Sequence, residues 1–158
     1  MDYCIRDAQP QDLEQLEQLE NSCFSCPWSR DVLASQLPGE HNEFLVAADR
    51  QGRLLGYIGM IIVLDEGDIS NVAVRPEARR QGIANALLIS MLQLAAQRKL
   101  SFVTLEVRQS NMPARALYAK HGFLPVGLRK GYYTAPREDA VLMTKFFTEG
   151  AGNEDPCL

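Results

Sequence analysis

A basic loop that leads into a helix pattern is the part of the sequence best suited to bind an anion. It runs from Arg75 through Arg79 and Arg80 to Gly82, where helical spacing begins. Backbone N–H groups at a helix N-terminus lack partners within the helix and carry partial positive charge, so they bind phosphate oxygens. Gly82 has no Cβ and allows these oxygens a close approach. The loop predicts a pyrophosphate site, although the same pattern alone is also typical of a solvated turn.

The cysteines give a weaker signal for metal or redox chemistry. Cys23 and Cys26 form a Cys-x-x-Cys pair, but a zinc site needs four ligands and no second pair of this kind is present. The pair precedes Pro27 and Trp28 in an apparent loop, whereas a redox dithiol commonly opens a helix. We therefore expect no metal and two ordinary thiols.

Hydrophobic spacing indicates the elements that must position these residues. Strand and helix patterns are interspersed along the chain, which predicts an α/β domain of packed layers. The expected strands cover residues 3–7, 44–48, 54–64, 68–74, 102–107, 124–133 and 140–147. The expected helices run from residue 11 onward, from a Ser29 cap to residue 37, from residue 82 through an apolar stripe, and from residue 113 to residue 121.

Composition excludes several classes of protein. The 158 residues, 46% hydrophobic and 23% charged, suit one globular domain, which we place at residues 1–148. The polar, Gly-rich residues 149–158 are expected to form a disordered tail. A net charge of −4 argues against direct binding to nucleic acid or an anionic membrane. We expect a monomer or a weak dimer.

The start of the chain and its apolar runs predict a cytoplasmic protein. Asp2 follows Met1, and neither a basic segment nor an apolar segment of a secretory signal is recognisable. The longest apolar run, residues 58–64, is far shorter than the roughly 20 residues of a membrane span. Four irregularly spaced cysteines do not form the pattern of a secreted disulfide framework.

The loop and its surroundings resemble the acetyl-CoA motif of the GNAT superfamily of N-acetyltransferases. The pattern Arg79-x-x-Gly82-x-Ala84 follows the apolar residues 72–74. The resemblance spans nearly the whole chain, and within the superfamily the chain is most similar to the bacterial ribosomal-protein-alanine N-acetyltransferases. The segments that carry it are Pro27-Trp28-Ser29, Leu64-Asp65-Glu66, Leu105-Glu106-Val107-Arg108, Ser110-Asn111, Ala116-Leu117-Tyr118, Gly122-Phe123, Tyr132-Tyr133 and Arg137-Glu138-Asp139-Ala140.

This resemblance implies a fold, a cosubstrate and a set of binding residues. The fold is the GNAT (acyl-CoA N-acyltransferase) fold, a mixed central β-sheet flanked by helices, and the cosubstrate is acetyl-CoA, without a metal. The main chain of three residues would face the acetyl and pantetheine portion: Val72, Ala73 and Val74. The pyrophosphate would be wrapped, largely by backbone N–H groups, by Arg80, Gln81, Gly82, Ile83, Ala84 and Asn85. Asn111 would hydrogen-bond the cosubstrate from a second motif, and Arg79, Arg80, Arg115 and Lys120 are candidates for the nucleotide phosphates.

Glu106 is the best candidate for the general base that acetyl transfer to an amine requires. It stands in the otherwise apolar segment 103–107, where burial would raise the pKa of its carboxyl group toward the working range. Glu106 also fits simple alternation with Thr104 and Arg108, which would instead place it on a solvent-facing side of a strand.

Tyr118 is the candidate general acid toward the departing thiolate of CoA. A phenol with a pKa near 10 facing a thiol near 8.5 loses about 2 kcal/mol on full proton transfer, so concerted donation is favoured. The alternative is a helix tyrosine that packs beside Leu117. Main-chain N–H groups near residues 72–74 are the expected donors to the oxyanion. No cysteine lies in the matched cosubstrate motifs, so we expect direct transfer.

The acidity of amines favours an α-amine as the acceptor. At pH 7, neutralising a lysine costs about 4.6 kcal/mol, whereas neutralising an α-amine costs about 1.4 kcal/mol. A single tuned carboxylate suits the easier amine. The acceptor surface is expected from residues 24–28, 65–66 and 132–139, where Trp28, Tyr132 and Tyr133 are either groove walls or packing aromatics. The acidic residues there favour a basic peptide.

The leading hypothesis is acetylation of the N-terminal alanine of a small-subunit ribosomal protein, number eighteen. It combines the resemblance with the acidity argument. The first alternative is a GNAT enzyme that acts on small-molecule amines or internal lysines. A CoA-binding module without catalysis is the second, and the presence of both Glu106 and Tyr118 weighs against it.

Overall fold

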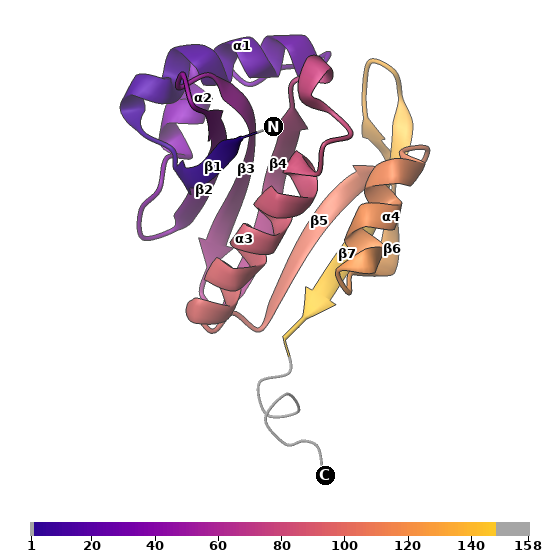
Figure 1. The fold of residues 1–158 in the computed structure, drawn as a ribbon. Helices are drawn as coiled ribbons and strands as arrows, with labels where there is room; N and C mark the ends of the chain where they lie inside the picture. Colours follow the sequence, from indigo (N-terminus) through magenta and orange to yellow (C-terminus); the bar gives the residue numbers. More distant parts are fainter. Residues whose placement is uncertain (1, 148–158) are drawn as a thin grey trace. The chain divides into compact units, whose positions relative to one another are not determined.

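The computed structural model describes residues 2–147, so the expected tail at residues 149–158 lies outside the described residues. The strands are β1 (Tyr3–Asp7), β2 (Asn42–Asp49), β3 (Leu54–Val63), β4 (Glu66–Val74), β5 (Phe102–Arg108), β6 (Leu124–Tyr133) and β7 (Glu138–Phe146). The helices are α1 (Leu13–Cys23), α2 (Arg30–Ser35), α3 (Ile83–Gln97) and α4 (Met112–Lys120), with short 3-10 turns at Pro10–Asp12 and Pro76–Ala78. Figure 1 labels the strands and the α-helices, and their sequence confirms the expected α/β order.

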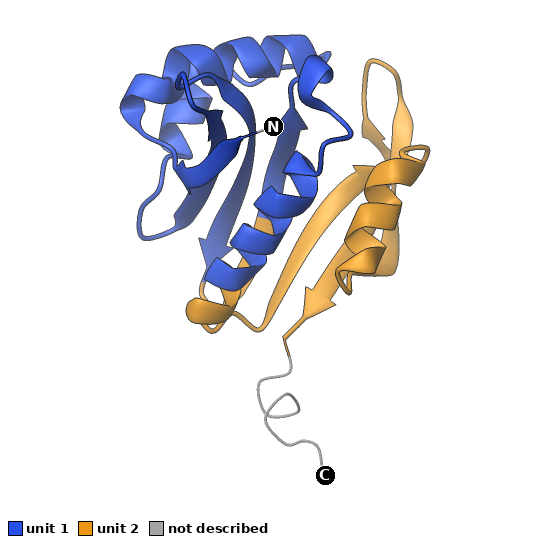
Figure 2. Ribbon diagram, in the orientation of Figure 1, with its two compact units in different colours: residues 1–63, 69–94 blue, residues 64–68, 95–158 orange. Residues whose placement is uncertain are grey.

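The hydrogen-bonded strand order is β1-β2-β3-β4-β5-β7-β6, a mixed sheet. By its contacts the chain divides into two compact units, coloured separately in Figure 2. The first unit comprises residues 1–63 and 69–94, and the second comprises residues 64–68 and 95–158. Strand β4 contributes to both units, because its residues 66–68 pair in parallel with residues 102–104 of β5 in the second unit.

The first unit is built on the antiparallel strands β1, β2 and β3 and on the apolar faces of the first helices. Leu16 and Leu19 of α1 and Leu33 of α2 are fully buried with Phe44. Ser29 caps α2 as expected, because its hydroxyl accepts a hydrogen bond from the backbone N–H of residue 32. Helix α2 ends at residue 35, earlier than the predicted residue 37.

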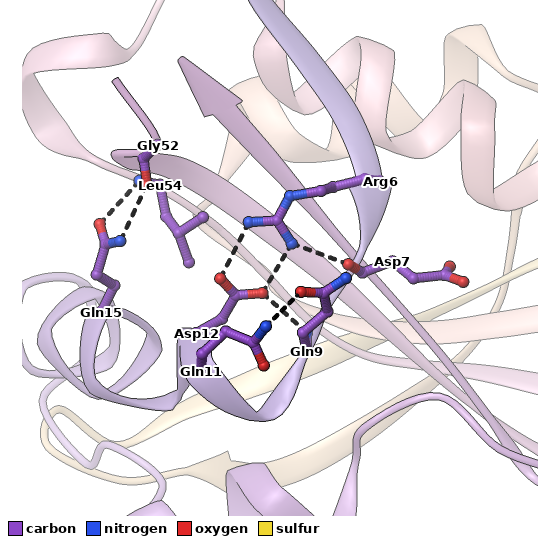
Figure 3. A network of polar contacts seen from close by, with 8 residues as sticks. All are labelled: Arg6, Asp7, Gln9, Gln11, Asp12, Gln15, Gly52 and Leu54. Atoms are coloured by element: carbon purple, nitrogen blue, oxygen red, sulfur yellow. Dashed lines mark hydrogen bonds and ion pairs between the residues drawn. The ribbon is translucent and has the colours of Figure 1, made fainter. Parts of the chain in front are cut away.

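A partly buried ion pair ties the start of α1 to strand β1. The guanidinium of Arg6 donates two hydrogen bonds to the carboxylate of Asp12, at 2.8 and 3.0 Å, and the backbone N–H of Gln9 donates a third (Figure 3). The hydrogen bonds from Arg6 hold the pKa of the Asp12 carboxyl below its usual value, although burial opposes them. Gln15 of α1 bridges the turn after β2 by accepting from the backbone N–H of Leu54. These contacts fix α1 against the sheet of the first unit.

The second unit pairs β5 with β7 and β7 with β6, all antiparallel. Along β5 the residues Val103, Leu105 and Val107 are buried, and the positions between them are half-buried. Helix α4 ends before Gly122, whose φ of +92° is the left-handed conformation expected of a helix-terminating glycine. Within residues 2–147, no helix combines the length and the apolar character that crossing a membrane requires.

Candidate active site

The loop before α3 in the first unit has the backbone geometry of an anion-binding site. Arg80 and Gly82 both adopt left-handed conformations, with φ of +64° and +79°. A Cβ on Gly82 would meet no atom within 4 Å, so the positive φ, rather than crowding, is what favours glycine here. The N–H of Ala86 donates to the carbonyl of Gly82 at 3.0 Å. The N–H groups of residues 83–85 therefore lie in the first turn of α3, ahead of this hydrogen bond along the chain. Such a turn at the start of a 15-residue helix suits a phosphate group.

The side chain of Arg79 links this loop to the end of β4 and to Cys23. Its Nε donates to the carbonyl of Val74 at 3.0 Å, and its Nη2 lies 3.7 Å from the sulfur of Cys23. The thiol of Cys23 donates to the same carbonyl at 3.5 Å. Sequence reasoning kept Cys23 apart from the cosubstrate motif, whereas the structure brings its sulfur against the loop and the end of β4. Arg79 and Arg80 are both exposed.

Close packing of β3 against β4 sets the position of the strand that carries residues 72–74. A Cβ on Gly56 of β3 would lie only 2.6 Å from the carbonyl oxygen of Ala73, so no side chain fits there. Ala73 and Ile83 are themselves buried. Their side chains therefore belong to the core, so only their main-chain groups would be available to a ligand.

A buried carboxylate network in the first unit escaped the sequence analysis. Glu20 of α1 is 1% exposed, and its carboxylate accepts hydrogen bonds from the backbone N–H of Trp28 (2.7 Å), from the Asn71 side chain (2.9 Å) and from the hydroxyl of Tyr57. Burial raises the pKa of Glu20 above its usual value, although the hydrogen bonds from Trp28 and Asn71 oppose this rise. The available signal was its place four residues after the buried Leu16 on one helix face.

In the second unit, Glu106 lies on the β5 face that it shares with Thr104 and Arg108. Buried and half-buried residues alternate along β5, as the sequence predicts. The side chain of Glu106 is nevertheless only 16% exposed, so this face of the strand is not open to solvent at Glu106. Its Oε2 lies 3.0 Å from Nε of Arg129 on β6. Glu106 is thus a mostly buried carboxylate that is paired with a cation.

Asp68 is a second carboxylate beside Glu106, and the sequence analysis missed it. Burial, followed by the negative charge of Glu106, raises the pKa of Asp68 to about 6, and the positive charge of Arg129 opposes this rise. The residue still reaches solvent. Burial raises the pKa of Tyr132 most, and the negative charges of Glu106 and Asp68 raise it further. We call these four residues, Asp68, Glu106, Arg129 and Tyr132, the carboxylate cluster.

The pairing of β4 with β5 explains why Asp68 and Glu106 come together. Asp68 pairs with Thr104, two residues before Glu106 and on the same face of β5. Pairing of this kind joins distant segments, so spacing along either strand alone could not reveal it. The sequence showed that Thr104 and Glu106 share one face of β5, but it did not show which residue of β4 pairs with Thr104.

Tyr118 and Asn111 occupy opposite ends of α4. Tyr118 is 8% exposed, and its ring centroid lies 5.8 Å from that of Phe123. Burial raises the pKa of its phenol to about 12, so the hydroxyl stays protonated at neutral pH. Asn111 caps the helix, with its Oδ1 accepting from the N–H of Ala114 at 3.2 Å. Packing therefore accounts for the ring of Tyr118, and capping accounts for Oδ1 of Asn111.

The three candidate groove aromatics differ in their surroundings. Trp28 packs against the hydrophobic core of the first unit. Tyr133 lies under the guanidinium of Arg108, which is 4.5 Å from its ring centroid. Tyr132 is exposed and meets Tyr133 edge to face. Among the three, Tyr132 has the most surface available to a peptide.

The predicted site residues thus form two groups. The expected cosubstrate residues, 72–74 and 80–85, belong to the first unit, and Glu106, Asn111 and Tyr118 belong to the second. Over the described part of the chain, three or more His, Cys, Asp or Glu side chains nowhere gather as metal ligands would.

Comparison with known proteins assigns this arrangement to a family. Residues 13–123 match the Acetyltransferase (GNAT) family. A relative from Bacillus subtilis (strain 168) is 36% identical over 139 residues, covering 88% of this chain and 92% of the relative. The ribosomal protein bS18-alanine N-acetyltransferase of Escherichia coli (strain K12) is 33% identical over 141 residues, covering 88% of this chain and 94% of its own.

A solved structure extends the match to three dimensions. The crystal structure of the ribosomal-protein-S18-alanine N-acetyltransferase from Escherichia coli superposes with a TM-score of 0.87 at 31% sequence identity. The match covers 98% of this chain and all of that one, which confirms the expected GNAT fold. The chain therefore belongs to the acetyltransferase (GNAT) family and is an acetyl-CoA-dependent N-acetyltransferase.

Proposed function

We propose that the protein transfers the acetyl group of acetyl-CoA to the α-amine of the N-terminal alanine of ribosomal protein bS18. The Escherichia coli relatives named for this reaction support the acceptor. The observation that carries the proposal is the carboxylate cluster, in which Asp68 and Glu106 face one exposed cation, Arg129. Two neighbouring carboxylates attract a protonated amine and can then accept its proton.

The first unit holds the cosubstrate in this proposal. The left-handed residues Arg80 and Gly82 and the N-terminus of α3 bind the pyrophosphate, mainly by main-chain N–H groups of residues 80–85. The main chain of residues 72–74 lies along the acetyl and pantetheine portion and supplies the oxyanion donors. In the second unit, Asn111 binds through its Nδ2 group, because its Oδ1 caps α4. Acetyl-CoA supplies the activated thioester.

Glu106 and Tyr118 divide the proton transfers between them. The carboxylate of Glu106 takes the proton that the acceptor ammonium must lose before its nitrogen attacks the thioester carbonyl. Tyr118 donates its phenolic hydrogen toward the sulfur as the C–S bond breaks. The attacking nitrogen loses its second proton as the amide forms, and transfer of that proton through solvent restores the phenol of Tyr118. With the pKa of Tyr118 at about 12 and a thiol near 8.5, complete prior transfer would cost about 5 kcal/mol. Donation is therefore concerted with departure of the thiolate.

An α-amine matches this machinery better than a lysine does. It is easier to neutralise by about 3 kcal/mol at pH 7. The cluster also favours a cationic acceptor, as expected for a basic ribosomal protein. The cytoplasmic location and the monomeric or weakly dimeric state expected from the sequence belong to the same proposal.

An acetylation assay over a panel of acceptors tests the proposed function. The panel pairs the N-terminal peptide of bS18 with the same peptide blocked at its α-amine, and adds peptides with other first residues and small amines. We expect rapid acetylation of the free bS18 peptide, and none at the α-position of the blocked one. Preferential acetylation of small amines or of internal lysines would contradict the proposal.

A further inference from the structure

Two Arg–Glu ion pairs among the described residues of the second unit are held in different ways. Arg108, 27% exposed, donates to Glu138 at 3.2 Å and also to the backbone carbonyls of Thr134 and Pro136. Its guanidinium also stacks on the ring of Tyr133. Glu138 in turn accepts from the backbone N–H of residue 110 at 2.6 Å. This pair is built into the turn between β6 and β7.

Within residues 2–147, no comparable backbone contacts anchor the pair between Arg129 and Glu106. The side chain of Arg129 is 55% exposed, and it meets Glu106 through Nε at 3.0 Å. Its guanidinium carbon lies 5.8 Å from the ring centroid of Tyr132, which is itself exposed. An exposed arginine on a flexible stem is readily displaced, whereas the carboxylate that it covers is mostly buried.

We propose that Arg129 holds the place of the acceptor's ammonium group at Glu106 and gives it up when the acceptor binds. This inference rests on the proposed function, because it requires a cationic amine as the acceptor. A guanidinium and an ammonium group repel each other, so both cannot be satisfied beside one carboxylate without cost. Arg129 therefore lowers the affinity for the acceptor while it satisfies a buried charge in the free enzyme.

The neighbouring charges support this competition. Asp68 faces Glu106 from β4, while Arg129 and Tyr132 face it from β6, and Tyr133 feels its charge as well. On β7 the residue paired with Glu106 is Leu142, which cannot ionise. Arg129 is the cation that these residues share, so its departure leaves two carboxylates to receive one ammonium group.

Steady-state kinetics of Arg129→Gln test the proposal, with the bS18 peptide varied at saturating acetyl-CoA. We expect the acceptor KM to fall about two- to fivefold, the range that a partly exposed ion pair represents. The KM for acetyl-CoA should not change. Arg129→Lys retains a cation and should keep the acceptor KM of the wild type. Lys130→Gln is the matched control, because it removes one positive charge from the next residue of β6 and should leave both KM values unchanged.

An unchanged or higher acceptor KM in Arg129→Gln would overturn the proposal, because Arg129 would then orient Glu106 rather than compete at it. Equal falls in Arg129→Gln and Lys130→Gln would also overturn it, since net charge alone would explain the effect. If the wild-type enzyme acetylates no α-amine, the proposed function fails and this inference fails with it. If the wild-type enzyme is active but Arg129→Gln does not alter the acceptor KM, this inference alone fails.

Discussion

Glu20 and Glu106 are both mostly buried carboxylates, but their hydrogen-bond partners differ. Glu20, in the first unit, accepts from Trp28, Tyr57 and Asn71, all of them fixed by helix, strand or core packing. Glu106, in the second unit, has the exposed Arg129 as its ion-pair partner. A carboxylate that the fold satisfies contributes to structure, whereas one covered by a displaceable side chain is available to a ligand.

The largest expected effect is on activity, from Glu106→Gln. Loss of a general base should lower kcat/KM by about 10²- to 10⁴-fold. The unfolding midpoint should change little, because the amide remains able to bond and Arg129 is exposed. Steady-state kinetics and thermal unfolding measure the two effects separately. Glu14→Gln, an exposed change on α1, is the control for both. Turnover that survives in Glu106→Gln and in Tyr118→Phe would show that the catalytic assignment is wrong.

Tyr57→Phe, which removes one hydrogen bond to Glu20, is expected to affect stability more than activity. It should lower the free energy of unfolding by about 1–3 kcal/mol, because a buried carboxylate loses a donor. Activity well below the unfolding temperature should fall by much less than in Glu106→Gln. Denaturant unfolding measures the first quantity, with Tyr3→Phe on β1 as the control. A catalytic defect of Tyr57→Phe as deep as that of Glu106→Gln would erase the contrast between the two carboxylates.

A pH-dependent difference in stability is expected for Asp68→Asn. The pKa of Asp68 is raised from 3.8 to about 6, so the folded protein binds this proton more tightly than the unfolded chain does. The resulting stabilisation is complete below about pH 4 and is lost as the pH rises through about 6. The Asn variant lacks this titration, so its stability relative to the wild type should increase across that interval and then level off. Denaturant unfolding at a series of pH values measures the difference.

The same variant distinguishes the cluster from the Glu20 network. Glu20 titrates in both proteins, so its contribution cancels in the comparison. Parallel stability curves for Asp68→Asn and the wild type would mean that Asp68 does not have a raised pKa, and that the cluster does not pay for its function with stability.

The smallest effect is expected from Cys23→Ala. The Cys23 sulfur contacts Val74 and Arg79, but direct transfer needs no thiol. Turnover should therefore stay within about twofold of the wild type, because the sulfur hydrogen bond that the variant loses is weak and only partly buried. Single-turnover assays measure the rate, and mass spectrometry of the quenched enzyme looks for an acetyl group on Cys23. An acetylated cysteine that forms and decays at the turnover rate would contradict direct transfer.

Spacing along the chain predicted the elements well. The β-branched and apolar residues of segment 102–107 predicted the strand β5, and Gly82 was correctly placed at the start of α3. The end of α2 was placed two residues too late, because Pro38 marks where a helix cannot continue rather than where it stops. Local pattern therefore determined the type of each element better than its end.

Contacts between distant residues were beyond this reasoning. Glu20 meets Tyr57 and Asn71 across 37 and 51 residues of sequence, and Arg79 meets Cys23 across 56. Asp68 meets Glu106 only because β4 and β5 pair in one register. Side-chain type suggested Glu106 as a base, whereas pairing and packing determined its partners.

The most direct test of the central claim is to locate the acetyl group on one peptide. The peptide begins with the N-terminal sequence of bS18 and carries one internal lysine, and wild type and Glu106→Gln are each incubated with it and acetyl-CoA. Tandem mass spectrometry then assigns the modified nitrogen at early times. We predict acetylation of the alanine α-amine by the wild type and a rate lower by about 10²-fold or more in the variant. Acetylation of the lysine instead, or equal rates for the two proteins, would contradict the account.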